Sequence, residues 1–165
     1  MRMLSELQQK DVWENWVGAE IRSNYFADLC SKYQWQQKLL TWLILVCSSG
    51  SAAAFITDRL PSDWQWVKPG LALTTACLSI FSLVQQNQKR TTDCADLHFR
   101  WSRLGDEYKA LWDDMYSDLA LDRLRSLEEK EAELSKSSTG FPNKERAMLK
   151  WEKYVLEHHG MQVSA

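Results

Sequence analysis

The sequence contains none of the short motifs that commonly mark a catalytic or metal site. It has no glycine-rich phosphate loop, no GxSxG serine motif and no HExxH histidine pair. Its four cysteines include no CxxC spacing, so they indicate neither a zinc finger nor a disulfide framework. We therefore expect the chain not to be an enzyme and to use no cofactor.

The sequence also lacks a strong excess of charge of one sign. It has 20 Lys and Arg against 22 Asp and Glu, and the two signs alternate along the chain. Such mixing is typical of solvated helix faces, whereas a nucleic-acid-binding protein usually carries a basic stripe. We expect no direct nucleic-acid partner.

Charge is missing altogether from one long stretch. Residues 39–57, LLTWLILVCSSGSAAAFIT, contain no charged side chain, and residues 65–84 contain one, Lys68, near the beginning. The apolar core of a bilayer requires about 20 helical residues. The two segments therefore predict a transmembrane helical hairpin over residues 39–86, with the lipid bilayer as a partner.

Tryptophans support this interpretation. The chain has nine, and four of them lie near the ends of the predicted spans, where an interfacial belt would place them: Trp35, Trp42, Trp64 and Trp66. The alternative is a pair of buried helices in a soluble bundle. It is disfavoured because soluble helices normally have a polar face, and residues 39–55 offer few polar groups.

Basic residues near the spans predict the orientation. The connecting turn holds Arg59 and Lys68 only, whereas the other side holds Lys32, Lys38, Lys89, Arg90, Arg100 and Arg103. Because basic residues favour the cytoplasmic side, we expect both termini in the cytoplasm.

The remainder of the chain is predicted to be helical, which makes the protein all-α. Residues 5–38 form an amphipathic helix with Ser5 or Asp11 as its N-cap, and its apolar stripe contains Leu7, Trp13, Val17, Ile21, Tyr25, Leu29 and Tyr33. A cytosolic helical stalk is predicted over 87–136. A Gly- and Pro-containing linker over 135–142 leads to a short helix over 143–158.

The stalk carries an apolar seam with steps of four and three residues. It contains Leu97, Trp101, Leu104, Tyr108, Leu111 and Met115, with His98 beside it. This 3.5-residue spacing is typical of helices that pack against other helices. Cys94 and His98 share a helix face and could supply two zinc ligands, but no second pair is visible, so we predict a packed histidine and no metal.

Hydroxyl groups follow one face of the second predicted span. Thr75, Ser79, Ser82 and Gln86 recur at i, i+4, i+7 and i+11, and the first span has small residues that include Ser48 and Ser51. Small and hydroxyl residues let helices pack closely. Alternatively, several copies around an axis could turn the same side chains toward a polar lumen. The residues by themselves favour packing.

The layout resembles the SLATT family, the SMODS and SLOG-associating two-transmembrane effectors of bacterial anti-phage defence. The resemblance covers residues 13–127 and is strongest over 95–111, where His98 is followed by Tyr108-Lys109-Ala110-Leu111. It rests on the order of the helices and on this one segment. The chain departs from a complete sensing system because it contains no recognisable nucleotide-binding domain.

The resemblance implies an effector of the bacterial inner membrane that stays silent until a partner protein senses infection. The partner would be a sensor or a producer of a nucleotide signal, encoded nearby. Activation would permeabilise the membrane and stop the phage by abortive infection. The hydroxyl residues of the spans then become pore-lining candidates in a homo-oligomer, and the stalk seam becomes an oligomer or signal-input surface. A non-conducting membrane scaffold that tethers a cytosolic partner is the alternative.

Overall fold

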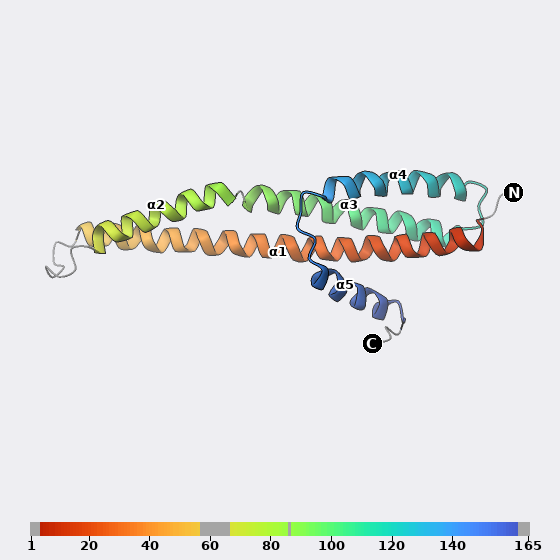
Figure 1. Ribbon diagram of the computed structural model, residues 1–165, viewed down its shortest axis with the longest axis horizontal. Coiled ribbons are helices and arrows are strands. Elements are labelled where there is room, and N and C mark those ends of the chain that lie inside the picture. Colours follow the sequence, from red (N-terminus) through yellow and green to blue (C-terminus); the bar gives the residue numbers. More distant parts are fainter. Residues whose placement is uncertain (1–3, 57–66, 86, 162–165) are drawn as a thin grey trace. The chain divides into compact units, whose positions relative to one another are not determined.

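The computed structural model describes residues 4–56, 67–85 and 87–161. Within these ranges it describes the backbone alone at residues 50–56, 67–68, 71, 83–85 and 87. All regular structure in the described residues is helical, so the all-α class is confirmed. In chain order the helices are α1 (Glu6–Ile56), α2 (Val67–Gln85), α3 (Asn87–Asp113), α4 (Ala120–Ser138) and α5 (Glu145–His158) (Figure 1).

The chain divides into two units. Residues 1–29 and 93–165 form the first, which we call the bundle unit, and residues 30–92 form the second, which we call the hairpin unit. Helix α1 contributes its first part to the bundle unit and its second part to the hairpin unit.

Helix α1 begins with a capping box. The Ser5 hydroxyl accepts a hydrogen bond from the Gln8 amide at 3.3 Å, and the Gln8 side-chain oxygen accepts one from the Ser5 amide at 2.9 Å. This exchange satisfies two amide groups that a helix N-terminus leaves without partners. Of the two predicted caps, Ser5 is therefore correct, and Asp11 lies inside the helix.

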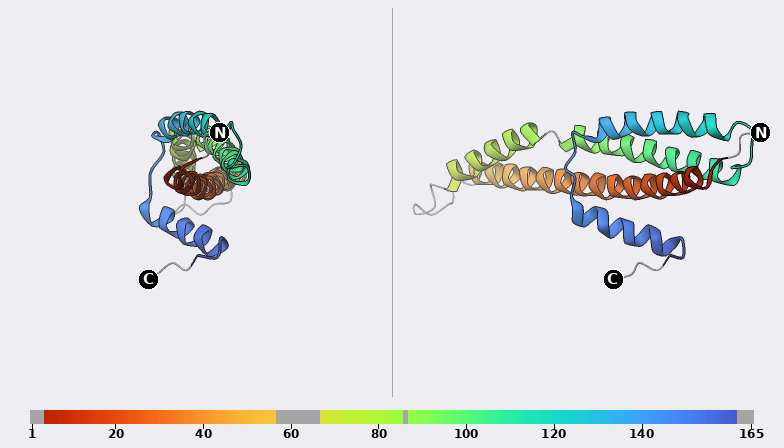
Figure 2. Two further views of the ribbon diagram at one scale, coloured as in Figure 1. Left: turned by 90° about the vertical axis from the view of Figure 1, so that its right-hand side faces the viewer. Right: turned by 45° about the vertical axis from the view of Figure 1, so that its right-hand side comes forward.

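The bundle unit is built on three neighbouring helices, namely the first part of α1, α3 and α4, and α3 runs antiparallel to the other two (Figures 1 and 2). Their facing sides fill the core. It includes Val12, Trp16 and Phe26 from α1, Leu97, Trp101, Leu104, Tyr108 and Leu111 from α3, and Leu124, Leu127 and Leu134 from α4. The heptad-like steps in α3 are the spacing that this kind of packing requires.

The buried stripe of α1 differs from the predicted one. Leu7 is 75% exposed, and the buried positions include Val12, Trp16, Ala19 and Ser23, which the four-residue spacing omitted. The reason is that α1 is covered on two sides. Helices α3 and α4 cover one side of α1, where Ser23 contacts His98 of α3, and α5 covers another, so one stripe does not account for all its contacts (Figures 1 and 2).

The predicted stalk is interrupted. The chain turns back after Asp113, and α4 returns antiparallel to α3 (Figure 1). In the turn, backbone amides donate hydrogen bonds to carbonyls three residues earlier. These bonds run from Asp114 N to Leu111 O, from Ser117 N to Asp114 O and from Ala120 N to Ser117 O. The sequence DDMYSDLA is rich in Asp and Ser, which favour turns, whereas the helix predicted over residues 87–136 runs through it.

Helix α5 is held on α1 at both ends. Near its start, the Tyr25 hydroxyl donates a hydrogen bond to the Pro142 carbonyl and accepts one from the Lys144 amide. Just after its end, His159 Nε2 lies 2.8 Å from Glu20 Oε2. Val155 is buried between these two anchors. The linker and the short helix predicted over 143–158 therefore belong to the bundle unit.

In the hairpin unit α2 runs back beside the later part of α1 (Figure 1). Pro69 lies in the first turn of α2, where its missing amide hydrogen removes no helical hydrogen bond. Helix α2 ends at Gln85 and α3 begins at Asn87.

Among the described residues, no helix combines the length and the apolar character that crossing a membrane requires. Parts of the two predicted spans fall outside these residues. They are residues 57–66, which include the predicted turn, and the side chains of residues 50–56, 67–68, 71 and 83–84. The membrane hairpin therefore stays a prediction.

Candidate functional site

The predicted hydroxyl face of α2 is the partly covered face of that helix. Thr75, Ser79 and Ser82 are half-buried, whereas Leu73 and Ile80 on the same helix are exposed. Because α2 lies beside α1, this difference places the three hydroxyls on the side of α2 nearer to α1. The arrangement in one chain is the one expected of helix packing.

Hydroxyl groups in the hairpin unit also form hydrogen bonds inside their own helices. Ser79 Oγ donates to the Thr75 carbonyl at 2.8 Å, and Thr74 Oγ1 donates to the Gly70 carbonyl at 2.8 Å. Thr41 does the same in α1, with a distance of 2.9 Å to the Gln37 carbonyl. A hydroxyl that bonds to the preceding turn is satisfied without water.

The other pore-lining candidates are placed less fully. Ser48 is exposed on α1. For Ser51 the structure describes the backbone, which is helical, and the side chain lies outside the described residues, as does Gln86 altogether. The structure therefore brings together three of the six candidates, on α2.

Large apolar side chains cover the outside of the hairpin unit. Trp42 is 70% exposed, and Leu45 is 60% exposed. The other exposed large apolar side chains of this unit are Trp35, Leu39, Leu43 and Val46 on α1 and Leu73, Ile80 and Phe81 on α2. Exposed apolar groups of this number on adjacent helices mark a surface that contacts lipid or another protein.

The predicted seam of the stalk lies inside the bundle unit. Leu97, Trp101, Leu104, Tyr108 and Leu111 are buried against the chain's own α1 and α4, and His98 and Met115 are half-buried. These side chains cannot contact a second copy unless the bundle opens. That they form an oligomer or signal-input surface stays a prediction, and in the single chain the turn after Asp113 lets α4 cover them.

A polar network crosses this core and was not foreseen from the sequence. Arg22 Nη1 lies 2.9 Å from Glu131 Oε1, and the Tyr108 hydroxyl donates to Glu131 Oε2 at 3.0 Å. The Arg22 guanidinium also lies over the Trp101 ring, 4.5 Å from its centre. Burial, and after it the charge of Glu131, raises the pKa of Tyr108 far above its ordinary value. Arg22, Tyr108 and Glu131 come from α1, α3 and α4, so their spacing along the chain did not predict this contact.

His98 joins α3 to α1. Its Nδ1 lies 2.9 Å from both the Ser23 carbonyl oxygen and the Ser23 hydroxyl oxygen. A carbonyl only accepts, so this contact requires a hydrogen on Nδ1. That nitrogen therefore cannot take a proton from Ser23, and the pair serves as a link between helices and not as a nucleophile with its base.

No further metal ligands lie beside Cys94 and His98 among the described residues. Cys94 is fully buried in the core, and His98 is engaged by Ser23. Over the residues whose placement is described, no three His, Cys, Asp or Glu side chains gather as metal ligands.

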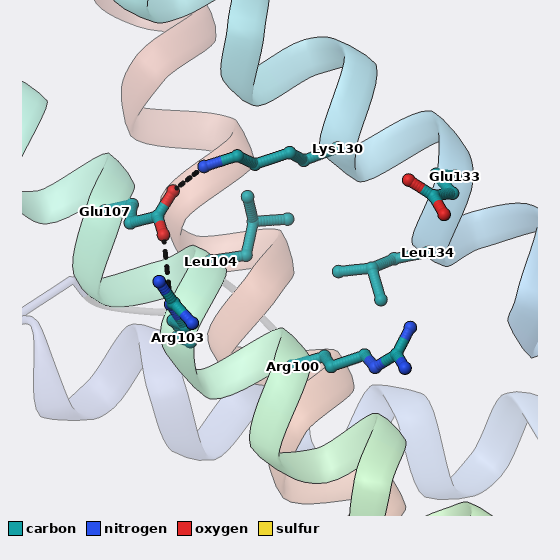
Figure 3. A pocket seen from close by; sticks show the side chains of 7 residues that line it. All are labelled: Arg100, Arg103, Leu104, Glu107, Lys130, Glu133 and Leu134. Atoms are coloured by element: carbon teal, nitrogen blue, oxygen red, sulfur yellow. Dashed lines mark hydrogen bonds and ion pairs between the residues drawn. The ribbon is translucent and has the colours of Figure 1, made fainter.

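A groove of about 280 Å³ separates α3 from α4 (Figure 3). Leu104 and Leu134 point into it, and Glu107 binds both Arg103 and Lys130 at one end (Figure 3). Arg100 lies at the other end and pairs with Asp96 on its own helix at 2.9 Å. Opposite charges thus neutralise each other along the rim, and the groove shows no preference for a ligand of either sign.

An aromatic cluster surrounds the contact between His159 and Glu20. The His159 ring packs edge-on against Trp13 and Trp16, with centroid distances of 5.2 and 4.9 Å. Trp16 Nε1 donates to Glu20 Oε1 at 3.0 Å, so both carboxylate oxygens are engaged. This cluster fixes the end of α5 to α1.

Comparison of the chain with family models, with curated proteins and with solved structures found no match.

Proposed function

We propose that the chain is an oligomeric membrane effector that permeabilises the bacterial inner membrane when activated, as part of an abortive-infection defence against phage. The hairpin unit would insert into the bilayer, and the bundle unit would stay in the cytoplasm and receive a signal from a sensor partner. The observation that carries the proposal is the apolar outer surface of the hairpin unit, from Trp42 and Leu45 on α1 to Ile80 on α2.

The chemistry of this surface suits lipid. Exposed Leu, Ile, Val, Phe and Trp side chains are unfavourable in water, and burying such area contributes about 25 cal/mol per Å². The hydroxyls of Thr41, Thr74 and Ser79 bond to carbonyls of their own helices, which is how polar side chains are satisfied where water is absent. Both features support insertion of the hairpin.

One hairpin cannot enclose a pore, so permeabilisation requires several copies. In the single chain the face with Thr75, Ser79 and Ser82 lies toward α1. This arrangement fits a resting, closed form. Activation would part α1 from α2 and bring the hydroxyl face to a lumen shared by the copies.

Release of a dye from liposomes that carry the purified chain tests the proposal. We expect Ser79→Leu to abolish release, because a leucine makes the lumen apolar. Ala76→Leu is the matched control, since Ala76 lies on the exposed side of α2 and a leucine there would face lipid. Flotation of the liposomes checks that both variants insert. Equal release by the wild type and Ser79→Leu would contradict a pore lined by α2.

The half-buried hydroxyls favour one alternative, a non-conducting scaffold that tethers a cytosolic partner to the membrane. In that case Thr75 and Ser79 serve only to pack the hairpin. The scaffold predicts insertion without dye release at any ratio of protein to lipid. It also predicts that a partner protein is retained on liposomes through the bundle unit.

A further inference from the structure

A second cavity in the bundle unit lies between α1, α3 and α5. Its volume is about 320 Å³, which is in the range of pockets for small ligands. The residues that decide its chemistry are Glu20 from α1, His98, Gly105 and Asp106 from α3, and Tyr154 and His158 from α5.

Two carboxylates, Glu20 and Asp106, line this cavity together with two histidines, His98 and His158. Among its described lining residues there is no Lys or Arg. Both oxygens of Glu20 are engaged, by Trp16 and His159. Asp106 is exposed and therefore presents the carboxylate that an entering ligand would meet. The Tyr154 ring also lines the cavity and is stacked on the His158 ring, with 6.4 Å between their centroids, so a ligand would find an anion and an aromatic ring together.

Gly105 provides independent support. It is buried in the interior of α3, where glycine is less favourable for helix stability than alanine. A Cβ atom at this position would lie 3.7 Å from the Ala19 Cβ and 3.8 Å from the Glu20 Cγ, which are ordinary contacts. Helix packing therefore does not require glycine here. Its missing side chain leaves room in the cavity.

We propose that this cavity binds a small organic ammonium ion, such as a polyamine. The ammonium group would pair with the Asp106 carboxylate, and the methylene chain would lie over Gly105 and against Tyr154. Carboxylates and aromatic faces both attract ammonium groups. Since α5 supplies one wall, a bound ligand favours the docked position of α5. The site does not depend on whether the hairpin forms a pore.

Calorimetric titration of spermidine into the full chain tests the proposal. The chain is held in nanodiscs of zwitterionic lipid, because anionic lipid would itself bind the polyamine. We expect saturable binding to one site, weakened about tenfold or more by Asp106→Asn through the loss of a charged hydrogen bond. Asp113→Asn, on the exposed last turn of the same helix, should stay within about twofold of the wild type.

Gly105→Ala separates binding from stability. We expect it to raise the midpoint of thermal unfolding by about 2–4 °C through helix propensity, and at the same time to weaken spermidine binding. Gly18→Ala in α1, where a Cβ meets no atom within 4 Å, should raise the midpoint similarly and leave binding unchanged. The proposal is overturned if spermidine shows no saturable binding, or if Asp106→Asn and Asp113→Asn lose the same affinity for spermidine. It is also overturned if Mg²⁺, added at the same concentration of positive charge, displaces spermidine.

Discussion

The bundle unit and the hairpin unit place the same kinds of side chain in opposite positions. In the bundle unit Trp101 and Leu111 are completely buried. In the hairpin unit Trp42 and Leu45 are mostly exposed. Both pairs lie on long helices of one chain, so the residue type does not decide burial.

The difference teaches what each unit needs to be stable. Three helices and α5 surround the apolar core of the bundle unit, and its outside carries charged residues beside exposed apolar ones such as Phe99 and Leu149. Two helices cannot enclose their apolar side chains, because each helix has only one neighbour. The exposed apolar side chains of the hairpin unit are the reason why we propose lipid around it.

The largest effect is expected when a tryptophan is removed from each unit. Trp101→Ala should lower the free energy of unfolding by about 3–5 kcal/mol, because it leaves a cavity in a packed core. Trp42→Ala should change it by about 0.5 kcal/mol or less, since the side chain is exposed. Denaturant unfolding of the full chain in detergent, followed by circular dichroism, measures both.

Similar losses in the two tryptophan variants would break the comparison between the units. They would mean that Trp42 is buried in an assembly of the chain. A size measurement in the same detergent would then show the oligomer directly.

A somewhat smaller effect is expected when a charge is placed on an exposed leucine. Leu45→Asp in the hairpin unit should weaken partition into the bilayer by about 2.5–3.5 kcal/mol, the cost of a carboxylate within a span. Leu149→Asp, on the exposed face of α5 in the bundle unit, should leave partition unchanged. Liposome flotation at several lipid concentrations compares them. If both variants float like the wild type, the apolar surface of the hairpin unit does not face lipid.

The smallest effect concerns the polar network that distinguishes the core of the bundle unit. The pKa of Tyr108 is raised by burial and by Glu131, so the unfolded chain loses this proton first as the pH rises above about 10. Alkaline pH therefore lowers the stability of the wild type, by at most about 1.4 kcal/mol per pH unit from this group. Tyr108→Phe should remove that part of the slope, as measured by urea unfolding at pH 9, 10 and 11.

Tyr116→Phe provides the control for the alkaline slope. Tyr116 is 70% exposed, and removing its hydroxyl should leave the core of the bundle unit unchanged. An unchanged slope in Tyr108→Phe, or the same change in both variants, would show that Tyr108 is not what links the stability of the bundle unit to pH.

The helical class, the cap at Ser5 and the core seam from Leu97 to Leu111 followed from local patterns in the sequence. Each depends on residues a few positions apart, which a helix brings together by its own geometry. The turn at Asp114–Leu119 is also encoded locally, by Asp and Ser, but an apolar stripe that continues into Leu121 and Leu124 outweighed it. Without this turn the seam would lie on the surface of a single helix, whereas with the turn α4 covers it.

The candidate site could be foreseen only in part. The hydroxyl face of Thr75, Ser79 and Ser82 follows from helical periodicity, but its position toward α1 does not. The cavity between α1, α3 and α5 gave no signal, since its carboxylates Glu20 and Asp106 are far apart in sequence. Gly105 was the one local hint, because a glycine inside a helix usually has a reason.

The sequence by itself determined that the chain is helical, where α1 begins, and which face of α3 is apolar. These properties depend on hydrogen bonds and spacing within a few turns. Only the tertiary structure decided that α4 covers the α3 seam, that Glu131 joins Arg22 to Tyr108, and that α5 closes a cavity over Gly105. Such contacts depend on which helices become neighbours, and that choice reflects the total apolar area they bury against each other, which local patterns in the sequence do not reveal.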